Sequence, residues 1–123
     1  MENPIKLKEL TIEVENKEIA DKLVKVIKFI GKISNDNGFE LNKRFSDFFS
    51  DKNYNMILDL TNLNYINSTG IAIIFSMFFK CKDYQGKLVI GGVHEFVKKV
   101  LSMMTLPDDF KIYNSTEEAL NIF

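Results

Sequence analysis

The sequence predicts an α/β fold, with a mixed and mostly parallel β-sheet of about five strands and about four α-helices packed against it. Beyond an initial pair of strands, strand-like and helix-like segments alternate, which is typical of parallel strands joined by helical crossovers. Two later strands are continuous apolar runs, the pattern of strands covered on both faces. The 123 residues, 46% of them hydrophobic, have the length of one domain and enough apolar material for a packed core, so we expect a single domain over residues 1–123.

The first third of the chain predicts two antiparallel strands. Apolar and polar residues alternate over residues 5–15, as in a strand with one solvated face. Residues 16–18 are expected to form the turn and residues 23–33 the second strand, although lysines near its start would also suit a short helix. The first strand is expected to form an antiparallel edge of the sheet.

The middle of the chain predicts two helices separated by a strand. After a polar turn at residues 34–38, phenylalanines recur at helical spacing over residues 39–50, which indicates an amphipathic helix. Residues 54–60 form an apolar strand and residues 61–66 a connection. A second helix is expected from Ser68 or Thr69 to about Asp83, apolar on nearly all sides.

The last third predicts two strands and two helices. Gly86 is expected to end the second helix in a left-handed conformation, and Gly91 and Gly92 to close a strand over residues 87–90. A third helix over residues 93–104 should turn Phe96 inward with its other apolar residues. A short strand at residues 110–113 leads to a final helix, whose start carries the capping-box pattern of Ser115 followed by Glu118.

Charge and hydropathy exclude several classes of partner. With 16 Lys and Arg against 17 Asp and Glu, mixed along the chain, the net charge is −1, so nothing favours nucleic acid or an anionic membrane surface as ligand. The N-terminus lacks the apolar segment of a signal peptide, and no window has the length of a transmembrane helix. We therefore expect a cytoplasmic protein without membrane insertion.

Motifs of enzymes are missing from the sequence. There is no dinucleotide or P-loop glycine pattern, no paired-histidine motif and no Gly-x-Ser-x-Gly elbow. His94 is the sole histidine and has no companion ligands at metal-binding spacing, so it is interpreted as a surface residue. We expect no catalytic residues, no metal and no cofactor, and hence not an enzyme.

Two other reactive side chains have both a functional and a structural interpretation. Cys81 is the sole cysteine, and nearby lysines would lower its pKa, but a partly buried thiol at a helix end is the favoured interpretation. Asp59 lies alone in an apolar strand, where it is either a functional carboxylate or an acceptor for neighbouring backbone amides. The second interpretation is preferred, because buried carboxylates need partners.

The start of the second helix is the candidate site. Ligands and modifications in open α/β folds gather where strands deliver the chain to helix N-termini, and Ser68 would lie at such a point. Asn67, Ser68 and Thr69 are also preferred capping residues, so any of them could instead serve only to begin the helix.

The segment MILDLTNLNYINSTGIAII resembles the motif of the STAS domain family, and especially of stand-alone bacterial anti-sigma factor antagonists. In that family a strand with a hydrophobic-Asp-Leu ending leads through a loop to Asp-Ser-Ser/Thr-Gly and a helix. The downstream segment GKLVIGGVHEFVKKVLSMMTLPDDFKIYNSTEEAL is similar to the family's following strand, third helix and last helix. The resemblance covers about residues 5–122 and implies a STAS-like fold.

The resemblance also implies a mechanism. Antagonists of this family bind an anti-sigma factor that is also a serine kinase, which releases a sigma factor and activates transcription. The kinase phosphorylates the first serine of the motif, here Ser68, and a phosphatase reverses the change. Such a phosphoprotein places new charge on the docking surface. The resemblance implies that Asn67, Thr69 and Gly70 belong to the motif and to the partner-binding surface.

This chain departs from the family motif at Asn67, where the family has Asp. Asn keeps an acceptor for capping but lacks the charge. If a kinase needs that carboxylate, the alternative is a constitutive STAS adaptor in a transporter or other signalling complex. In either case we expect the partner to bind the second helix, with Ile73 and Met77 left exposed for it.

Overall fold

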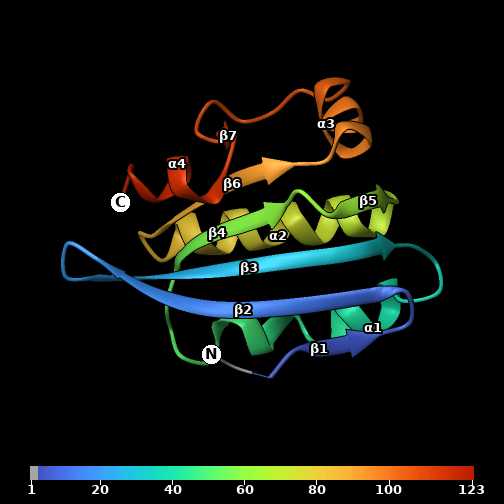
Figure 1. Cartoon of the computed structure of the whole chain (residues 1–123), viewed down its shortest axis with the longest axis horizontal. Helices are drawn as coiled ribbons and strands as arrows, with labels where there is room; N and C mark the ends of the chain where they lie inside the picture. The colour runs from blue at the N-terminus through green and yellow to red at the C-terminus, as the bar shows by residue number, and fades with distance from the viewer. Residues whose placement is uncertain (1–2) are drawn as a thin grey trace.

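The computed structural model describes residues 3–123, which form one seven-stranded sheet with four α-helices and a 3₁₀ helix (Figure 1). In chain order the elements are β1 (Ile5–Leu7), β2 (Leu10–Ile19), β3 (Lys22–Ile33), α1 (Gly38–Lys43), the 3₁₀ helix η1 (Phe45–Phe49), β4 (Asn55–Leu60), β5 (Leu63–Ile66), α2 (Ser68–Asp83), β6 (Lys87–Val93), α3 (Glu95–Ser102), β7 (Ile112–Tyr113) and α4 (Thr116–Leu120).

The sheet has the order β1-β2-β3-β4-β6-β7, and β5 pairs with β3 beyond the end of β4. The pairs β1·β2 and β2·β3 are antiparallel, whereas β3·β4, β3·β5, β4·β6 and β6·β7 are parallel. The predicted mixed and mostly parallel sheet with an antiparallel edge is therefore confirmed, with seven strands instead of about five.

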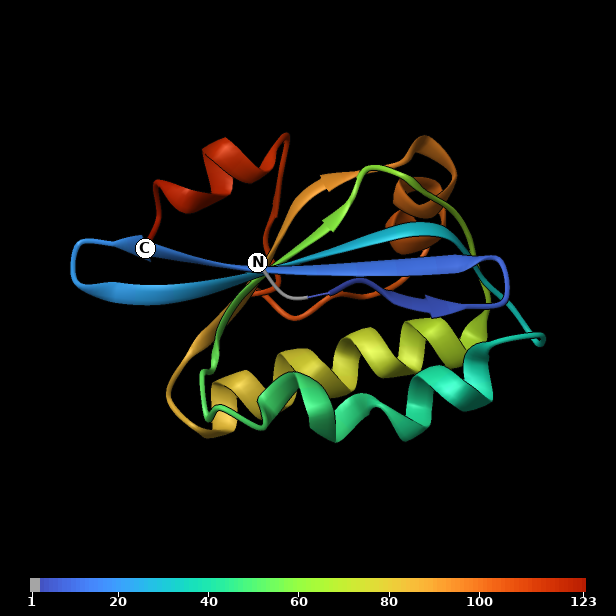
Figure 2. The same ribbon diagram turned by 60° about the horizontal axis from the view of Figure 1, so that its bottom comes forward.

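Helices cover both faces of the sheet. Figure 2 shows α1, η1 and α2 on one face and α3 and α4 on the other. Along β4, Met56 and Leu58 belong to the larger core that includes α2, whereas Ile57 belongs to a smaller core with Ala119 of α4. This two-sided burial explains why β4 is a continuous apolar run. No helix within residues 3–123 combines the length and hydropathy needed to cross a membrane.

The turn predicted at residues 16–18 is wrong, because β2 continues to Ile19. The loop between β2 and β3 is instead Ala20 and Asp21, with φ angles of 49° and 69°. Such left-handed turns are usually made by Gly, Asn or Asp, so Asp21 suits this hairpin but Ala20 does not, and the pair is a weak turn signal in the sequence. The hairpin extends past the rest of the sheet on the left of Figure 1.

The single helix predicted over residues 39–50 is broken in two. The chain leaves α1 at Arg44, which has φ −89° and ψ 2°, and continues as η1. Phe48 and Phe49 of η1 are buried in the core, whereas Phe39 near the start of α1 is 63% exposed. The phenylalanine spacing therefore identified a helical segment but not its interruption.

Four further features differ from the prediction. Residues 61–66, expected as a connection, contain β5. The left-handed residue after α2 is Gln85, with φ 65°, whereas Gly86 lies so close to β4 that a Cβ there would stand 2.0 Å from the Tyr54 carbonyl oxygen. β6 runs through the two glycines to Val93, and α3 begins at Glu95, later than expected. The capping of α4 is confirmed, since Ser115 Oγ accepts from the Glu118 N–H at 3.1 Å.

Candidate functional site at the start of α2

Asn67 is the residue that begins α2. Its side-chain Oδ1 accepts a hydrogen bond from the Gly70 N–H at 2.9 Å, and its carbonyl accepts from the Ile71 N–H at 3.0 Å. Its own N–H donates to the Ile33 carbonyl at the end of β3, at 3.1 Å. Of the three residues that could have capped the helix, Asn67 therefore does so.

The amide of Asn67 also ties α2 to the turn after β3. Its Nδ2 donates to Asn35 Oδ1 at 3.1 Å. That turn is held in place by Asn37, whose Nδ2 donates to the carbonyls of Lys8 and Lys32 at 2.6 and 2.8 Å. A carboxylate at position 67 could cap the helix equally well, but it could not donate to Asn35.

Ser68 is the first residue of α2 and is exposed. Because Asn67 supplies the cap, the Ser68 hydroxyl is not needed for it, and within residues 3–123 it makes no side-chain hydrogen bond. The first turn of a helix presents backbone N–H groups and the positive end of the helix dipole, both of which favour an anion. A phosphate attached to the Ser68 hydroxyl would therefore lie at the N-terminus of the helix, where a negative charge is favoured.

Thr69 and Gly70 complete the motif in different environments. Thr69 is exposed, and its methyl group lies beside Gly38 of α1. Gly70 is buried, and a Cβ added there would lie 2.6 Å from Ile66 Cγ1 and 2.8 Å from Ile33 Cγ2. The role of Gly70 is therefore close packing of α2 against β3 and β5, not contact with solvent or a partner.

The expectation that Ile73 and Met77 are exposed is wrong. They are 3% and 0% exposed, respectively, and belong to the larger core between α2 and the sheet. The solvated side of α2 is formed instead by Ala72, Ser76 and Phe79. The sequence of α2 is apolar nearly all round because α1 and η1 flank a helix that already rests on the sheet, so its pattern does not show which side is free (Figure 2).

Exposed aromatic side chains border the start of α2, and no sequence pattern indicates them. The rings of Tyr65 and Phe96 stack with centroids 5.5 Å apart, and they are 41% and 40% exposed. Phe39 follows Gly38, the neighbour of Thr69. Tyr65 was expected in a connection and Phe96 inside the core; both are displayed because β5 and α3 pack side by side at this end of the sheet.

None of the other candidate residues forms a reactive centre. Burial raises the pKa of the Cys81 thiol to about 12, although the charge of Lys25 opposes that rise, and the side chain is fully buried. His94 caps α3, with Nδ1 accepting from the Phe96 N–H at 3.1 Å. Asp59 Oδ1 accepts from the Thr61 N–H at 3.0 Å, which confirms the backbone-bonding interpretation. Within the described residues no three His, Cys, Asp or Glu side chains are placed to share a metal ion.

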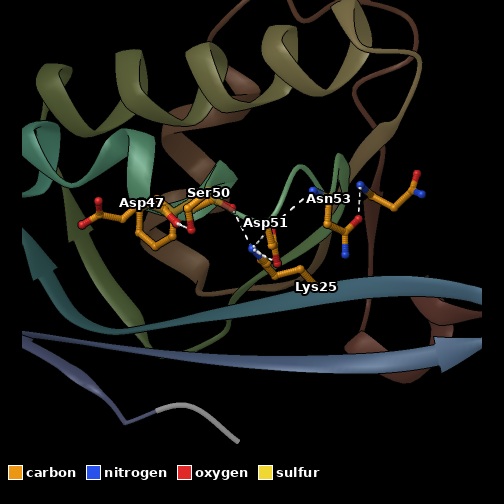
Figure 3. Close-up of polar contacts among 7 residues, drawn as sticks. Lys25, Asp47, Ser50, Asp51 and Asn53 are labelled. Atoms are coloured by element: carbon orange, nitrogen blue, oxygen red, sulfur yellow. Dashed lines mark hydrogen bonds and ion pairs between the residues drawn. The ribbon is translucent and has the colours of Figure 1, made fainter.

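A second polar cluster lies under η1, where Lys25 points from β3 (Figure 3). The Lys25 ammonium donates to the Phe48 carbonyl and to Asp51, each at 2.8 Å, beside a pocket of about 330 Å³. Sequence reasoning assigned Lys25 no role, since a lysine on a strand is ordinarily solvated. Its donors are engaged by protein oxygens, so the cluster joins two elements and does not present a free charge.

Comparison with known families identifies the domain. The family model described as "STAS domain" matches residues 13–119, most of the chain. Among curated sequences, the "Putative anti-sigma factor antagonist BtrV" of Bordetella bronchiseptica is 29% identical over 68 residues, which are 55% of this chain and 59% of that protein. The chain thus spans less than two thirds of the relative that it matches.

Solved structures share the fold. A structure described as "a putative anti-sigma factor antagonist (tm1081)" from Thermotoga maritima aligns with a TM-score of 0.70 and 23% identity, covering 89% of this chain and 92% of that one. An anti-sigma factor antagonist from Mycobacterium paratuberculosis aligns with a TM-score of 0.65 and 20% identity, covering 90% of this chain and 92% of that one. SpoIIAA in its unphosphorylated form aligns with a TM-score of 0.62 and 14% identity, covering 89% of this chain and 96% of that one. At these low sequence identities, the similarity shows a shared fold and nothing more.

Proposed function

Since the chain belongs to the STAS domain family, we propose that it is an anti-sigma factor antagonist, working as a single non-enzymatic domain in the cytoplasm. It binds an anti-sigma factor that is also a serine kinase, and the binding releases a sigma factor. The kinase phosphorylates Ser68 and thereby ends the interaction, and a phosphatase restores it. The names of BtrV and of the aligned structures, which describe anti-sigma factor antagonists, support the proposal.

The observation that carries the proposal is that Asn67 caps the helix and leaves the Ser68 hydroxyl free of that role. Asn67 supplies the helix cap, so the exposed hydroxyl of Ser68 has no structural task. An accessible hydroxyl on a rigid helix end is a suitable phosphate acceptor. A phosphoserine adds about −1.5 to −2 charges at neutral pH, and the helix N-terminus tolerates that charge without unfolding.

The proposed partner contact is the Ser68 surface, which we define as Phe39, Tyr65, Ser68, Ala72 and Phe96. It takes the place of Ile73 and Met77, which are core residues. Exposed aromatic rings supply the apolar contact area that protein interfaces favour. A phosphate on such a surface must be desolvated when the partner docks, which disfavours the complex.

Phosphorylation is tested with the anti-sigma factor kinase and ATP, by intact mass. The wild-type protein should gain one phosphate, Ser68→Ala should gain none, and Thr69→Ala, which alters the neighbouring exposed hydroxyl, should still gain one. Labelling that persists in Ser68→Ala would show that another residue is the acceptor. A Ser68→Asp variant should lose affinity for the anti-sigma factor while its circular dichroism spectrum stays unchanged.

A constitutive adaptor is the second candidate, and Asn67 is the observation that favours it. A kinase that must recognise a carboxylate at the position before the serine would not find one in this chain, because residue 67 is Asn. Phosphorylation that appears only in Asn67→Asp would support the adaptor. Co-purification would then recover a membrane ATPase or other non-kinase partner, whose binding is unaffected by Ser68→Asp. Recovery of an ATP-binding serine kinase, released by Ser68→Asp, would instead support the antagonist.

A further inference from the structure

The outer edge of β2 is mostly unpaired. β1 pairs only with the first three residues of β2, in the register Leu7↔Leu10 to Ile5↔Ile12. From Glu13 to Ile19 the strand is bonded to β3 on its inner side, and within residues 3–123 no strand lies against its outer side. An edge of seven residues is long enough to take another strand.

The two hairpin loops fix which backbone groups point outward. In a hairpin with a two-residue loop, the residues flanking the loop exchange hydrogen bonds. Leu10 therefore bonds toward β1, and Ile19, paired with Lys22, bonds toward β3. Because bonding alternates along a strand, the N–H and C=O groups of Val14, Asn16 and Glu18 face the free edge.

We propose that a second copy of this chain occupies this edge, with the two β2 strands antiparallel about a two-fold axis at Asn16. The outward groups of Val14 then meet those of Glu18 in the other copy, and Asn16 meets Asn16. On the face that carries α4, Glu15 lies opposite Lys17 of the second copy, and the same pair recurs across the axis. The interface is isologous, as in a closed dimer.

Charge selects this register over its neighbours. Glu15 and Lys17 already share one face of β2, where Lys17 Nζ lies 3.6 Å from Glu15 Oε1. A two-fold axis at Glu15 would place two glutamates opposite each other, and an axis at Lys17 two lysines; like charges directly opposite are destabilising. Charged edges ordinarily prevent strand pairing, but here the axis at Asn16 makes the same charges complementary.

The dimer is compatible with partner binding but does not depend on it. The free part of β2 runs toward the hairpin tip on the left of Figure 1, whereas α2 begins on the right, after β5. The Ser68 surface therefore stays uncovered when two β2 edges join. The proposal stands on the backbone pattern and charges of β2 and would hold whatever the partner of the Ser68 surface.

The test measures molecular mass by sedimentation velocity over a range of concentrations. The wild-type chain should dimerise. Glu15→Lys and Lys17→Glu each replace two attractive cross-strand pairs by two repulsive ones, so each should raise the dimer dissociation constant about tenfold or more. Mixing the two variants places two positive side chains opposite two negative ones, so the mixture should dimerise again. Lys99→Glu on α3 makes the same charge change away from the edge and should leave the dimer intact.

A backbone variant tests the strand pairing itself. Asn16→Pro removes an N–H that the monomer leaves unbonded, and edge strands accept proline at such positions. The variant should keep the wild-type circular dichroism spectrum but become monomeric. A wild-type chain that is monomeric at every concentration would overturn the proposal. So would a dimer that survives both charge reversals, or singly mutated chains that do not associate when mixed.

Discussion

Lys25 and Asp51 form the one ion pair in the described residues that has a buried partner. Lys25 Nζ lies 2.8 Å from both Asp51 oxygens, and the side chains are 4% and 44% exposed, respectively (Figure 3). The ammonium also donates to the Phe48 carbonyl at 2.8 Å. The pair thereby fastens the end of η1 to β3, and a buried ammonium is tolerated because its donors are satisfied.

Removing the carboxylate should destabilise the fold. Asp51→Ala leaves the Lys25 ammonium buried with one carbonyl partner, and since Asp51 itself is half exposed, we expect a loss of about 1–2 kcal/mol in the free energy of unfolding. Urea denaturation measures it. Lys25→Met removes the buried charge and keeps the apolar stem, so it should cost less. A larger loss for Lys25→Met than for Asp51→Ala would contradict this account.

The same pair makes stability depend on pH. Partial burial alone raises the pKa of the Asp51 carboxyl, but the hydrogen bond from Lys25 and the Asn53 N–H outweigh it, and the net pKa lies below its usual value. The folded state thus favours the charged form, so the stabilisation is present above the unfolded pKa of about 3.9 and is lost as the pH falls through the folded pKa. The stability difference between wild type and Asp51→Asn should be constant from neutral pH to about pH 5 and shrink below about pH 4. If the stability difference between wild type and Asp51→Asn instead grew as the pH falls, the pKa of Asp51 would be raised by folding and not lowered.

The order of strands and helices could be predicted because each core element has a local pattern. The apolar run of β4, the length of α2 and the cap of α4 all follow from short stretches of sequence. The turn of the β2–β3 hairpin could not, because Ala20 adopts a left-handed angle that alanine does not favour, and Asp21 alone is a weak turn signal. β5 was missed since it is short and is stabilised by pairing with β3, which is distant in sequence.

At the site, the motif could be predicted but the surrounding surface could not. Asn67, Ser68, Thr69 and Gly70 are contiguous, and their position at a helix start follows from the sequence. Whether an apolar residue of α2 faces the sheet or the solvent depends on where the neighbouring elements pack. The stack of Tyr65 on Phe96 likewise requires knowing that β5 and α3 are adjacent.

Gly70→Ala should destabilise the domain although alanine is the better helix former. Alanine gains about 1 kcal/mol over glycine in a helix, but its Cβ would stand 2.6 Å from Ile66 Cγ1, and overpacking costs about 1–3 kcal/mol. We expect a net loss of up to about 2 kcal/mol in urea denaturation. Gly38→Ala is the matched control, because its Cβ would meet only the Thr69 side chain, with the methyl at 3.3 Å, and it should be neutral or stabilising. Equal effects of the two changes would mean that packing against Ile66 and Ile33 does not limit position 70.

Charged substitutions along α2 should separate core from surface. Met77 is fully buried, so Met77→Glu places a carboxylate in the core and should unfold the domain or lower its stability by several kcal/mol, about 3 or more. Ser76→Glu, one position away on the exposed side, should stay within about 0.5 kcal/mol of wild type. Circular dichroism during thermal unfolding distinguishes them. A folded and stable Met77→Glu protein would mean that Met77 is a surface residue and not part of the core.

The thiol of Cys81 should be inert in the native protein. It is fully buried, and its pKa of about 12 keeps it protonated at pH 8, whereas disulfide exchange requires an accessible thiolate. An aromatic disulfide reagent should therefore modify the native chain only as fast as the structure opens, and should react at once with one thiol per chain in denaturant, since the sequence has a single cysteine. Asp51→Ala loosens the attachment of η1, the neighbour of α2, and should speed the native reaction in proportion to its loss of stability. Rapid labelling of the undisturbed native chain would instead mean that Cys81 is reachable from solvent and that the core around the end of α2 is open.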